Sequence, residues 1–471
     1  MKTIIEIHAL QNYAPSNLNR DDTGAPKDAL FGGTRRARIS SQCQKHAVRK
    51  YFDEVSSDFI KSPHLADRTK RLLSELQKKL AEKGRKGERV EEKLEIVFSS
   101  MGLKLKNNKT EYLLFLGRNE VDRLASLIDE KWDEIGDPVA RLSAIRSKLK
   151  ENLPGDEGKL GVIQYVLKIS GDKPKEEGVV TVENNFDDIL NVVNKHWDSI
   201  EPSKIFDDSG KPIKGRKKSD KGDWELDLEK VLKDGKDDVS ALGKSLLALL
   251  DGGKAIDLAL FGRMLANMPE KNQHASCQVA HAISSHTVER EFDFYTAMDH
   301  LKPEDTTGAD MMGTIEFNSA CFYRYAVIDW EKLVENLHGD TDLATKGLQA
   351  FLDGFVVAEP TGKQNSFAAH NVPEFVAVSV RRNTAPRNLA NAFETAIRVN
   401  KAESLTKESA TRLSAKSAAL DKFYGTTCNA RYVVSEDTFG EQFDAKGLGK
   451  QEESVAAVIE WALSEVIKKG E

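Results

Sequence analysis

Cysteines and long apolar runs are both scarce in this sequence of 471 residues. The four cysteines, Cys43, Cys277, Cys321 and Cys428, form no C-x-x-C pair, so neither a zinc ribbon nor a disulfide framework is indicated. No stretch approaches the ~20 consecutive apolar residues of a membrane helix, and the first residues lack the apolar run of a secretory signal. We therefore expect a cytoplasmic protein with no membrane partner.

The motifs of several large enzyme classes are also missing. Gly252-Gly253-Lys254 lacks the upstream glycine and the following hydroxyl residue of a P-loop, and no G-x-S-x-G or H-E-x-x-H sequence occurs. His281 and His286 would lie on opposite faces of a strand, which is unsuitable for a shared metal. His8 and His370 could form a general acid–base pair, but a single histidine at a strand edge is more often a surface residue. We expect no catalytic residues, no metal and no cofactor.

The sequence does contain a strongly basic segment within a slightly acidic whole. The formal net charge is −6, from 69 Lys and Arg against 75 Asp and Glu. Residues 29–50 nevertheless hold six basic residues and no acidic one, a local charge of +6 over 22 residues. The six are Arg35, Arg36, Arg38, Lys45, Arg49 and Lys50. Because local charge informs more than the total does, this segment indicates a nucleic-acid partner.

The second half of the basic segment predicts a helix that begins at Ser41. Ser41 and Gln44 have the spacing of a capping box. A predicted buried stripe recurs every four residues and consists of Cys43, Ala47 and Tyr51. The opposite face carries three polar side chains, those of Gln42, Lys45 and Arg49.

The first half of the basic segment, Gly32-Gly33-Thr34-Arg35-Arg36-Ala37-Arg38, combines glycines with closely spaced arginines. Glycines let a backbone approach an anion, and guanidinium groups suit phosphate oxygens. The following helix N-terminus, with Ser40 and Ser41, would add N–H donors and a positive dipole end. Together these features predict a phosphate-tracking site about one nucleic-acid backbone wide. The alternative is an ordinary basic helix with solvated side chains.

The order of the strong elements predicts an α+β protein with a ferredoxin-like core. The predicted elements are a half-buried strand at 3–10, an irregular segment at 11–39, the helix from Ser41, strands at 277–286 and 315–327, a helix at 330–355, a strand at 375–380, and helices at 388–400 and 453–468. Strand, helix, strand, strand, helix, strand is the split βαβ order, which RNA-binding domains commonly use. Asp329 is the predicted N-cap of the second helix. Tyr323 and Tyr325 share a parity with Val327, so we predict that they pack in the core and do not stack on bases.

Two insertions interrupt this predicted core. Residues 53–255 are rich in Lys, Glu, Asp and Leu with helical periodicity, and they separate the first helix from the second strand. A smaller insertion, around residues 288–313, separates the two central strands. Neither insertion breaks the helix or the strands of the core, so both can project from it.

Several collinear motifs, spread from residue 4 to about 400, resemble the CasC family, the backbone subunits of the type I-E CRISPR surveillance complex, Cascade. The longest runs are Ser16-Asn17-Leu18-Asn19-Arg20-Asp21-Asp22-Thr23-Gly24, Phe31-Gly32-Gly33-x-Arg35-Arg36-x-Arg38-Ile39-Ser40-Ser41-Gln42 and Ala280-His281-Ala282-Ile283-Ser284-Ser285-His286. Shorter ones are Ala259-Leu260-Phe261-Gly262-Arg263-Met264, Phe322-Tyr323-Arg324-Tyr325-Ala326, Lys363-Gln364-x-x-Phe367-Ala368-Ala369 and Ala390-Asn391-Ala392-Phe393-Glu394. Residues 53–255 show little that matches motif by motif.

The resemblance implies a right-hand-shaped, non-enzymatic protein. Its RRM-like palm would comprise residues 1–52 and 256–400, its helical fingers residues 53–255 and its thumb residues 288–313, with a C-terminal helical region at 401–471. Copies of such a subunit stack into a helical filament along a CRISPR guide RNA, and each thumb kinks the RNA bound by its neighbour. Other Cascade subunits and target DNA are the remaining implied partners.

The candidate RNA-binding residues combine the basic segment with positions that match the family motifs. They are Arg20, Lys27, Arg35, Arg36, Arg38, Ser40, Gln42, Lys45, Arg49, Arg263, Met264 and Lys363. Met264 matches a residue that wedges beside the bases, with Arg263 expected to reach phosphate; the alternative for Met264 is a core methionine. The motif at the implied base of the thumb contributes His281, Ser284, Ser285 and His286.

Two functions remain open at this point. The first is a structural subunit that coats guide RNA. The second is a CRISPR RNA-processing endonuclease on a related ferredoxin-like fold, which would need a His or Tyr base near the cleaved phosphate. The sequence favours the first, because no clustered acid–base set accompanies the basic helix.

Overall fold

The computed structural model describes residues 2–54, 60–133, 135, 162–167, 176–181, 216–218, 224–226, 239–265, 268–297, 311–398, 404–427, 429–440 and 443–468. The chain forms two compact units. Unit 1 consists of Met1–Arg68, Phe115–Glu120 and Asp251–Glu471, and unit 2 consists of Thr69–Leu114 and Val121–Leu250. Within the described ranges, no helix has the length and apolar character needed to cross a membrane.

Unit 1 is built on a large sheet with the strand order β18-β17-β16-β1-β15-β13-β3-β2, to which β12 and β14 add by pairing with β15. The strands are β1 (Thr3–Ser16), β2 (Asp28–Phe31), β3 (Thr34–Ile39), β12 (Cys277–Val279), β13 (Ala282–Ser284), β14 (Glu291–Ala297), β15 (Met311–Asp329), β16 (Phe375–Arg382), β17 (Ala430–Val434) and β18 (Lys450–Gln451). In the centre, β1 pairs antiparallel with both β15 and β16, and β15 pairs antiparallel with β12 and β13.

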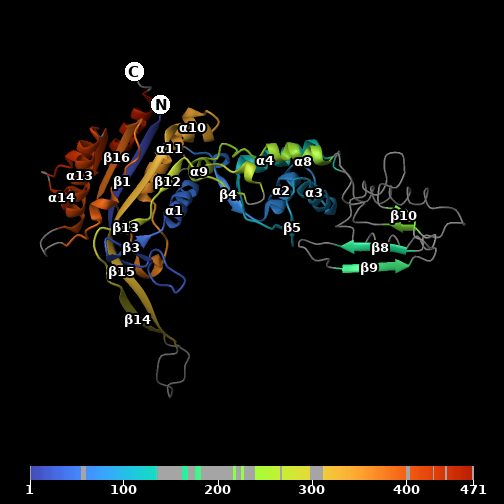
Figure 1. Ribbon diagram of the computed structural model, residues 1–471, viewed down its shortest axis with the longest axis horizontal. Coiled ribbons are helices and arrows are strands. Elements are labelled where there is room, and N and C mark those ends of the chain that lie inside the picture. Colours follow the sequence, from blue (N-terminus) through green and yellow to red (C-terminus); the bar gives the residue numbers. More distant parts are fainter. Residues whose placement is uncertain are drawn as a thin grey trace, which may run out of the picture. The chain divides into compact units, whose positions relative to one another are not determined.

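Helices cover both faces of this sheet (Figure 1). The helices of unit 1 are α1 (Ser41–Glu54), α9 (Ile256–Phe261), α10 (Trp330–Asn336), α11 (Thr341–Val357), α12 (Gln364–Phe367), α13 (Leu405–Tyr424), α14 (Glu436–Phe439) and α15 (Val455–Ile467). One core cluster joins Ile5 and Ile7 of β1 to Val48 of α1 and Phe351 of α11, and a second joins Leu10 and Tyr323 to Leu413 of α13. Since both faces are covered, residues 3–11 are all buried, and the prediction of a half-buried first strand is wrong.

Several predicted elements are confirmed, with bounds shifted by a few residues. These are the helix from Ser41, the long central strand β15, the strand β16 and the C-terminal helix α15. Asp329 caps α10, because its carboxylate accepts a hydrogen bond from the Lys332 N–H at 3.1 Å. The buried positions of Tyr323 and Tyr325, which are 2% and 5% exposed, confirm that these rings pack in the core.

The predicted single helix at 330–355 is wrong: it is two helices, α10 and α11. The break falls at His338 and Gly339, whose φ angles of 59° and 81° are left-handed and cannot continue a helix. Asp340 then caps α11 by accepting from the Leu343 N–H at 3.1 Å. The helix expected at 388–400 is reduced to a 3-10 turn at Ala390–Phe393.

The N-terminal segment and the C-terminal region hold more strand than expected. The segment predicted to be irregular, 11–39, contains the end of β1 and the hairpin of β2 and β3. Gly32 and Gly33 turn this hairpin at φ angles of 57° and 73°, and a Cβ on Gly32 would lie 1.6 Å from the Glu394 oxygen. The strand predicted at 277–286 is split into β12 and β13. The region predicted to be helical from 401 onward also contributes β17 and β18 to the sheet.

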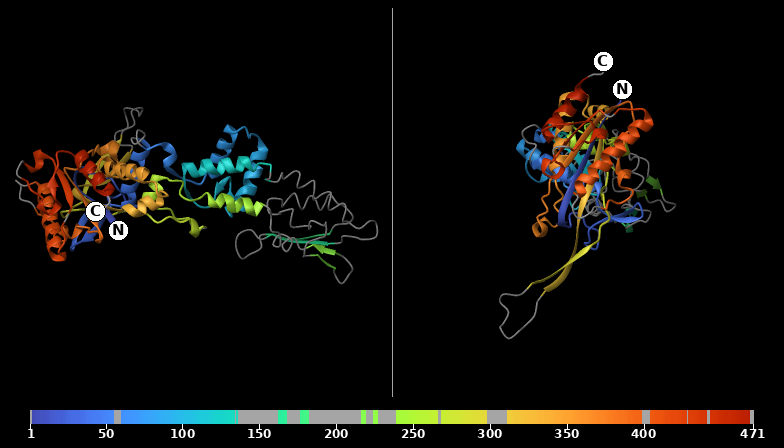
Figure 2. Two further views of the ribbon diagram at one scale, coloured as in Figure 1. Left: turned by 90° about the horizontal axis from the view of Figure 1, so that it is seen from above. Right: turned by 90° about the vertical axis from the view of Figure 1, so that its left-hand side faces the viewer.

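The insertion between the central strands forms a two-stranded hairpin, β14 with the first part of β15, which extends away from the rest of unit 1 (Figure 2). Its register runs from Glu291 opposite Phe317 to Ala297 opposite Met311. Every residue of β14 is exposed, including Phe292 at 65% and Phe294 at 63%. This hairpin corresponds to the segment that the family resemblance assigns to the thumb.

Unit 2 contains α2 (Leu72–Glu82), α3 (Glu88–Ser100) and α8 (Val239–Ala248), with most of α4 (Arg118–Glu130). A four-stranded sheet has the order β10-β11-β8-β9, with bounds Arg216–Lys218, Trp224–Leu226, Val162–Leu167 and Glu176–Thr181. The short strands β5 (Leu105–Lys106) and β6 (Lys109–Thr110) form a hairpin. Most of the residues of β4 (Ala66–Thr69) and β7 (Leu114–Gly117), which pair with each other, belong to unit 1. The insertion predicted to be helical therefore includes strands as well.

Candidate nucleic-acid interface

Side chains from three segments of unit 1 surround a cavity of about 500 Å³. The segments are the loop after β1 (Leu18–Gly24), one face of α1, and residues 359–362. The cationic residues at its wall are Arg20 and Lys50, with His46 beside them, and the acidic ones are Asp21, Asp22 and Glu359. Sequence analysis identified Arg20 as a site residue, but it did not assign His46 or Lys50 to the site. Their spacing with Cys43, at i, i+3 and i+7, was the signal that could have placed them on one helix face.

The N-terminus of α1 is capped by Ser40, one residue earlier than the predicted capping box. The Ser40 hydroxyl accepts a hydrogen bond from the Cys43 N–H at 3.2 Å, while Asn19 accepts one from the Ser40 N–H at 2.8 Å. The buried residues of the helix are Gln44, Ala47, Val48 and Phe52. Cys43 and Tyr51, predicted to be buried, are only partly so. Ser40 is 5% exposed, so its hydroxyl serves the helix cap.

Lys45 and Gln42 lie on the accessible side of α1. Gln42 is exposed and Lys45 is half-buried. The Lys45 ammonium lies 5.6 Å from the ring centroid of Phe261, at the distance of a cation–π contact. Among the ion pairs of the described residues, none involves Arg20, Lys27, Lys45 or Lys363. These four cations, together with the half-buried Arg38, whose guanidinium contacts the Asp28 carbonyl and His281, are therefore the accessible cations of the predicted set that have no anionic partner among the described residues.

Arg49 is not on a solvated face, and this prediction is wrong. Its Nε donates to the Asp257 carboxylate at 3.0 Å, its Nη2 donates to the Ala66 carbonyl at 3.2 Å, and its guanidinium lies 4.5 Å from the Phe115 ring centroid. Burial raises the pKa of Asp257 to about 6, and the Arg49 charge opposes that rise. Arg49 is thus the counter-ion of a buried carboxylate.

Arg36 is also a structural residue, contrary to the prediction that it contacts phosphate. It is 0% exposed. Its Nη1 donates to the Ser284 carbonyl at 3.0 Å and its Nη2 to the Phe393 carbonyl at 2.8 Å. The Nε donates to the Thr34 hydroxyl at 2.9 Å. These bonds join β3, β13 and the 3-10 turn, and they use the donors that a phosphate would need.

Arg35 and Arg38 are more accessible, but both contact Asp28. Arg35 is exposed and forms an ion pair with the Asp28 carboxylate, while Arg38 is half-buried and donates to the Asp28 carbonyl at 3.1 Å. Arg290, at the base of the hairpin, binds the same Asp28 carboxylate at 2.7 Å and Glu316 at 2.9 Å. Burial raises the pKa of Asp28, but hydrogen bonds from Arg290 and Arg35 outweigh it, so this pKa is lowered overall.

The four residues expected at the base of the thumb lie around β13 and have different environments. His281 is exposed and contacts Arg38 at 3.0 Å; burial and the charges of Arg38 and Lys27 lower its pKa. Ser284 accepts from the Ala37 N–H and Ser285 bonds Ser409, both as buried side chains. The His286 Nε2 accepts from the Cys321 N–H at 3.3 Å. The side chains of Ser284 and His286 therefore join neighbouring strands, and that of Ser285 joins the end of β13 to helix α13.

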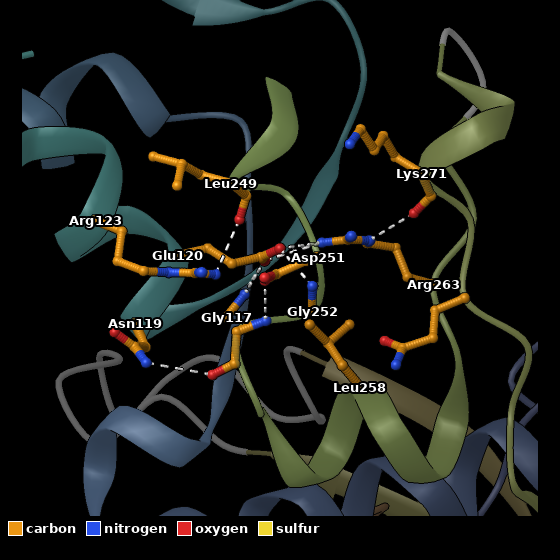
Figure 3. Close-up of polar contacts among 12 residues, drawn as sticks. Gly117, Asn119, Glu120, Arg123, Leu249, Asp251, Gly252, Leu258, Arg263 and Lys271 are labelled. Carbon is orange, nitrogen blue, oxygen red and sulfur yellow. Dashed lines mark hydrogen bonds and ion pairs between the residues drawn. The ribbon is translucent and has the colours of Figure 1, made fainter. Parts of the chain in front are cut away.

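Arg263 and Met264 are adjacent in sequence but have opposite environments (Figure 3 shows Arg263). Arg263 is 4% exposed and its guanidinium binds both carboxylate oxygens of Glu120 at 2.9 Å. The prediction that Arg263 reaches phosphate is therefore wrong. Met264 is 83% exposed, which contradicts the alternative of a core methionine.

Lys363 lies next to the wall of the cavity. It has a left-handed φ of 53° and precedes α12, which ends at Phe367 and is followed by Ala368, another left-handed residue with a φ of 47°. A Cβ on the neighbouring Gly362 would lie 2.2 Å from the Leu18 oxygen, so this segment packs closely on the loop that carries Arg20. Non-glycine residues held at positive φ concentrate at functional sites, because the surrounding structure must impose the strain.

The histidine pair considered for acid–base chemistry does not assemble. His8 is 1% exposed and its Nδ1 lies 2.8 Å from the Tyr323 hydroxyl; burial lowers its pKa to about 4. His370 has an exposed side chain that binds Glu359 at 2.7 Å. The expectation that His8 is a surface residue is wrong, because β1 is a central strand. Within the described ranges, no group of three or more His, Cys, Asp or Glu side chains could hold a metal ion.

Comparison with known proteins places this chain in a family. A family model described as CT1975-like protein matches residues 5–168 and 157–461, which together cover most of the sequence. The chain belongs to the CT1975-like protein family. No curated protein is similar enough to count as a match.

Two solved structures are similar over nearly the whole chain. One, described as "CRISPR RNA-guided surveillance complex, pre-nicking", is 26% identical with a TM-score of 0.66, covering 98% of this chain and 100% of that chain. Another, described as "CRISPR RNA-guided surveillance complex", is 21% identical with a TM-score of 0.60, covering 98% and 99%. The second establishes the fold alone. The family match and the first structure identify the CT1975-like chain as a Cas protein similar to a surveillance-complex subunit.

Proposed function

We propose that this protein is a non-catalytic backbone subunit of a type I-E Cascade complex, which polymerises along CRISPR guide RNA in the cytoplasm. The observation that carries the proposal is a set of accessible cations without an ion pair among the described residues, of which Arg20 lies at the wall of the cavity and Lys363 follows the wall residue Gly362. The chain that carries them is similar along nearly its whole length to a subunit of an RNA-guided complex. Further copies of this chain, other Cascade subunits and target DNA are the proposed partners. The guide would be held by its phosphates, which leaves its bases to pair with the target.

We also propose that the centre of unit 1 is a ferredoxin-like palm. In support, the order β16-β1-β15-β13 is antiparallel throughout, as the split βαβ arrangement requires. The two helices that connect these strands, α1 and α11, contribute Val48 and Phe351 to the same core cluster. Residues 288–313 would then be the thumb and most of 53–255 the fingers.

The internal contacts of three arginines reduce the number of residues that we propose to bind RNA. The guanidinium groups of Arg36, Arg49 and Arg263 each bind a carbonyl or carboxylate oxygen within unit 1. The proposed phosphate ligands that remain are Arg20, Lys27, Arg38, Lys45 and Lys363. Arg35, which is paired with Asp28, and Gln42 are the other exposed members of the predicted set. Sequence-independent binding suits such a set, because cations that contact phosphates recognise the charge and shape of the backbone, which are the same for every base sequence.

The decisive experiment is RNA affinity of the Lys27→Ala/Lys45→Ala variant at several salt concentrations. Each lost phosphate contact should reduce the salt slope by about 0.7 and weaken all single-stranded sequences alike. Lys27→Ala should change the free energy of unfolding by less than about 0.5 kcal/mol, since Lys27 has no ion pair within the described part of the chain. Lys45→Ala should lower it by roughly 0.5–1 kcal/mol, because its contact with the Phe261 ring is lost. The matched control is Lys446→Ala, which removes a lysine whose side chain is 87% exposed, pairs with Asp444 at 3.4 Å and does not line the cavity.

An unchanged salt slope in the double variant would refute the proposed interface. The endonuclease alternative is tested separately, by incubating the purified protein alone with precursor CRISPR RNA. We expect intact RNA after prolonged incubation. Cleavage would contradict the non-catalytic assignment while leaving RNA binding itself in place.

A further inference from the structure

Glu120 is a fully buried carboxylate that holds three separate segments of unit 1 together. It is 0% exposed. Its oxygens accept from the Gly117 N–H at 2.7 Å, from the Gly252 N–H at 2.7 Å and from Arg263 Nη1 at 2.9 Å (Figure 3). A buried charge is tolerated only where it is paired and hydrogen-bonded, and this one is.

Arg263 also forms hydrogen bonds that hold the backbone around it in place. Its Nε donates to the Lys271 carbonyl at 3.1 Å. Its N–H and carbonyl both bond to Gln273, each at 2.9 Å. Arg263 is therefore fixed at its side chain and at its backbone.

The residue that follows Met264 is anchored as well. Leu265 is 3% exposed, and its N–H donates to the Asn272 side chain at 2.6 Å. The backbone before Arg263 packs closely on the neighbouring segment, because a Cβ on Gly262 would lie 2.8 Å from the Gln273 carbonyl oxygen. Met264, at 83% exposed, is thus a large apolar side chain held outward between two fixed neighbours.

We propose that Glu120 is a positioning residue which, through Arg263, presents Met264 in one orientation to an unstacked base of the bound RNA. This inference rests on the proposed function. An apolar wedge held in place before binding loses little freedom when it meets a base, whereas a mobile methionine must be ordered first. The competing explanation is that the ion pair only stabilises the fold of unit 1.

A double-mutant cycle separates the two explanations. Glu120→Gln keeps the shape and one acceptor oxygen but removes the charge that binds Arg263, and Met264→Ala removes the wedge. We expect each single variant to weaken binding of unstructured single-stranded RNA severalfold. The combined variant should bind no more weakly than Met264→Ala alone, because a positioning residue has no effect once its target is absent.

A second readout uses no RNA. With carbon-13 methyl labels on the seven methionines, the Met264 signal is identified by its loss in Met264→Ala. Glu120→Gln should broaden or split this signal and leave the signals of buried methionines such as Met101 unchanged. Arg263→Lys, which keeps the charge but loses the Nε donor to the Lys271 carbonyl, should give an intermediate result and serves if Glu120→Gln folds poorly.

The matched control is Arg381→Gln, which breaks another buried ion pair of unit 1, that of Arg381 with Glu6. It should lower the melting temperature and leave both the Met264 signal and the RNA affinity unchanged. The inference is overturned if the losses of RNA affinity in the two single variants multiply in the combined variant. It is also overturned if the Met264 signal is unaltered in both Glu120→Gln and Arg263→Lys. If the wild-type protein fails to bind RNA at all, the proposed function fails instead.

Discussion

The two halves of strand β15 have the same secondary structure and opposite environments. Residues 320–328 are all buried, between β1 on one side and β12 and β13 on the other. Residues 311–317 pair only with β14, and Met311 and Met312 are 58% and 67% exposed. Both halves are rich in apolar side chains, so composition does not distinguish them. The difference lies in what covers each face of the strand.

This contrast separates residues that stabilise the fold from residues left for contact with a partner. In the buried half, side chains from both faces meet helices α1, α11 and α13 in two core clusters. In the hairpin, Phe292, Phe294 and Met312 lie on one face without a covering element in the described chain. Exposed apolar side chains gathered on one element indicate an interaction surface.

The largest expected effect is the difference in stability between two alanine substitutions, one in each half of β15. Ile328 is 0% exposed and pairs with Ile5 and Cys277 on neighbouring strands. Ile328→Ala should lower the free energy of unfolding by about 2–5 kcal/mol, through lost burial and the cavity left behind. Met312→Ala, the matched control in the hairpin, should change it by less than about 0.5 kcal/mol. Chemical denaturation of both variants gives the comparison, and similar losses would contradict it.

The next largest effect is a dependence of stability on pH that His8 causes. His8 lies on β1, opposite Tyr325 in the buried half of β15. Burial lowers the pKa of His8 to about 4, and Glu6 and Arg381 are the charged groups that face it. The unfolded chain, with an ordinary pKa near 6.5, takes up a proton below that pH while the folded chain does not. The contribution of His8 to the free energy of unfolding is fully present above pH 6.5. It decreases by about 1.4 kcal/mol per pH unit as the pH falls from 6.5 toward 4.

Comparison with His8→Gln isolates this contribution from the other titrating groups. Asp257, whose pKa is raised to about 6, acts in the opposite sense and is present in both proteins. We expect the free energy of unfolding of the wild type to fall more steeply between pH 6.5 and 4.5 than that of the variant. Parallel curves would mean that His8 is not the cause.

The smallest predicted effect lies at the end of the buried half, where β15 leads into α10. Asp329→Ala removes the acceptor for the Lys332 N–H and should cost about 1 kcal/mol of stability. The control is Ser435→Ala, at a helix start where the side chain makes no capping bond. That substitution should have almost no effect on the melting temperature, and a loss equal to that of Asp329→Ala would show that capping is not responsible.

Local patterns in the sequence were enough for many elements of the fold. The alternation from Ile315 to Val327 predicted β15, and the spacing of Val455, Ile459 and Leu463 predicted α15. Sequence reasoning missed the break at His338, because the chain there turns by backbone angles that composition does not signal strongly. It also missed β17, which acquires its partner only by pairing with β16.

By itself, the sequence determined where a basic segment stands, where its helix begins and which motifs link the chain to a Cas family. Only the tertiary structure decided which cations remain available. Arg49 meets a carboxylate 208 positions away, Arg263 one 143 positions away, and Arg36 a carbonyl 357 positions away. Such partners are brought together by folding across the whole of unit 1, and no local periodicity carries that information. The physical reason is that the environment of a charged side chain is set by the elements that pack around it.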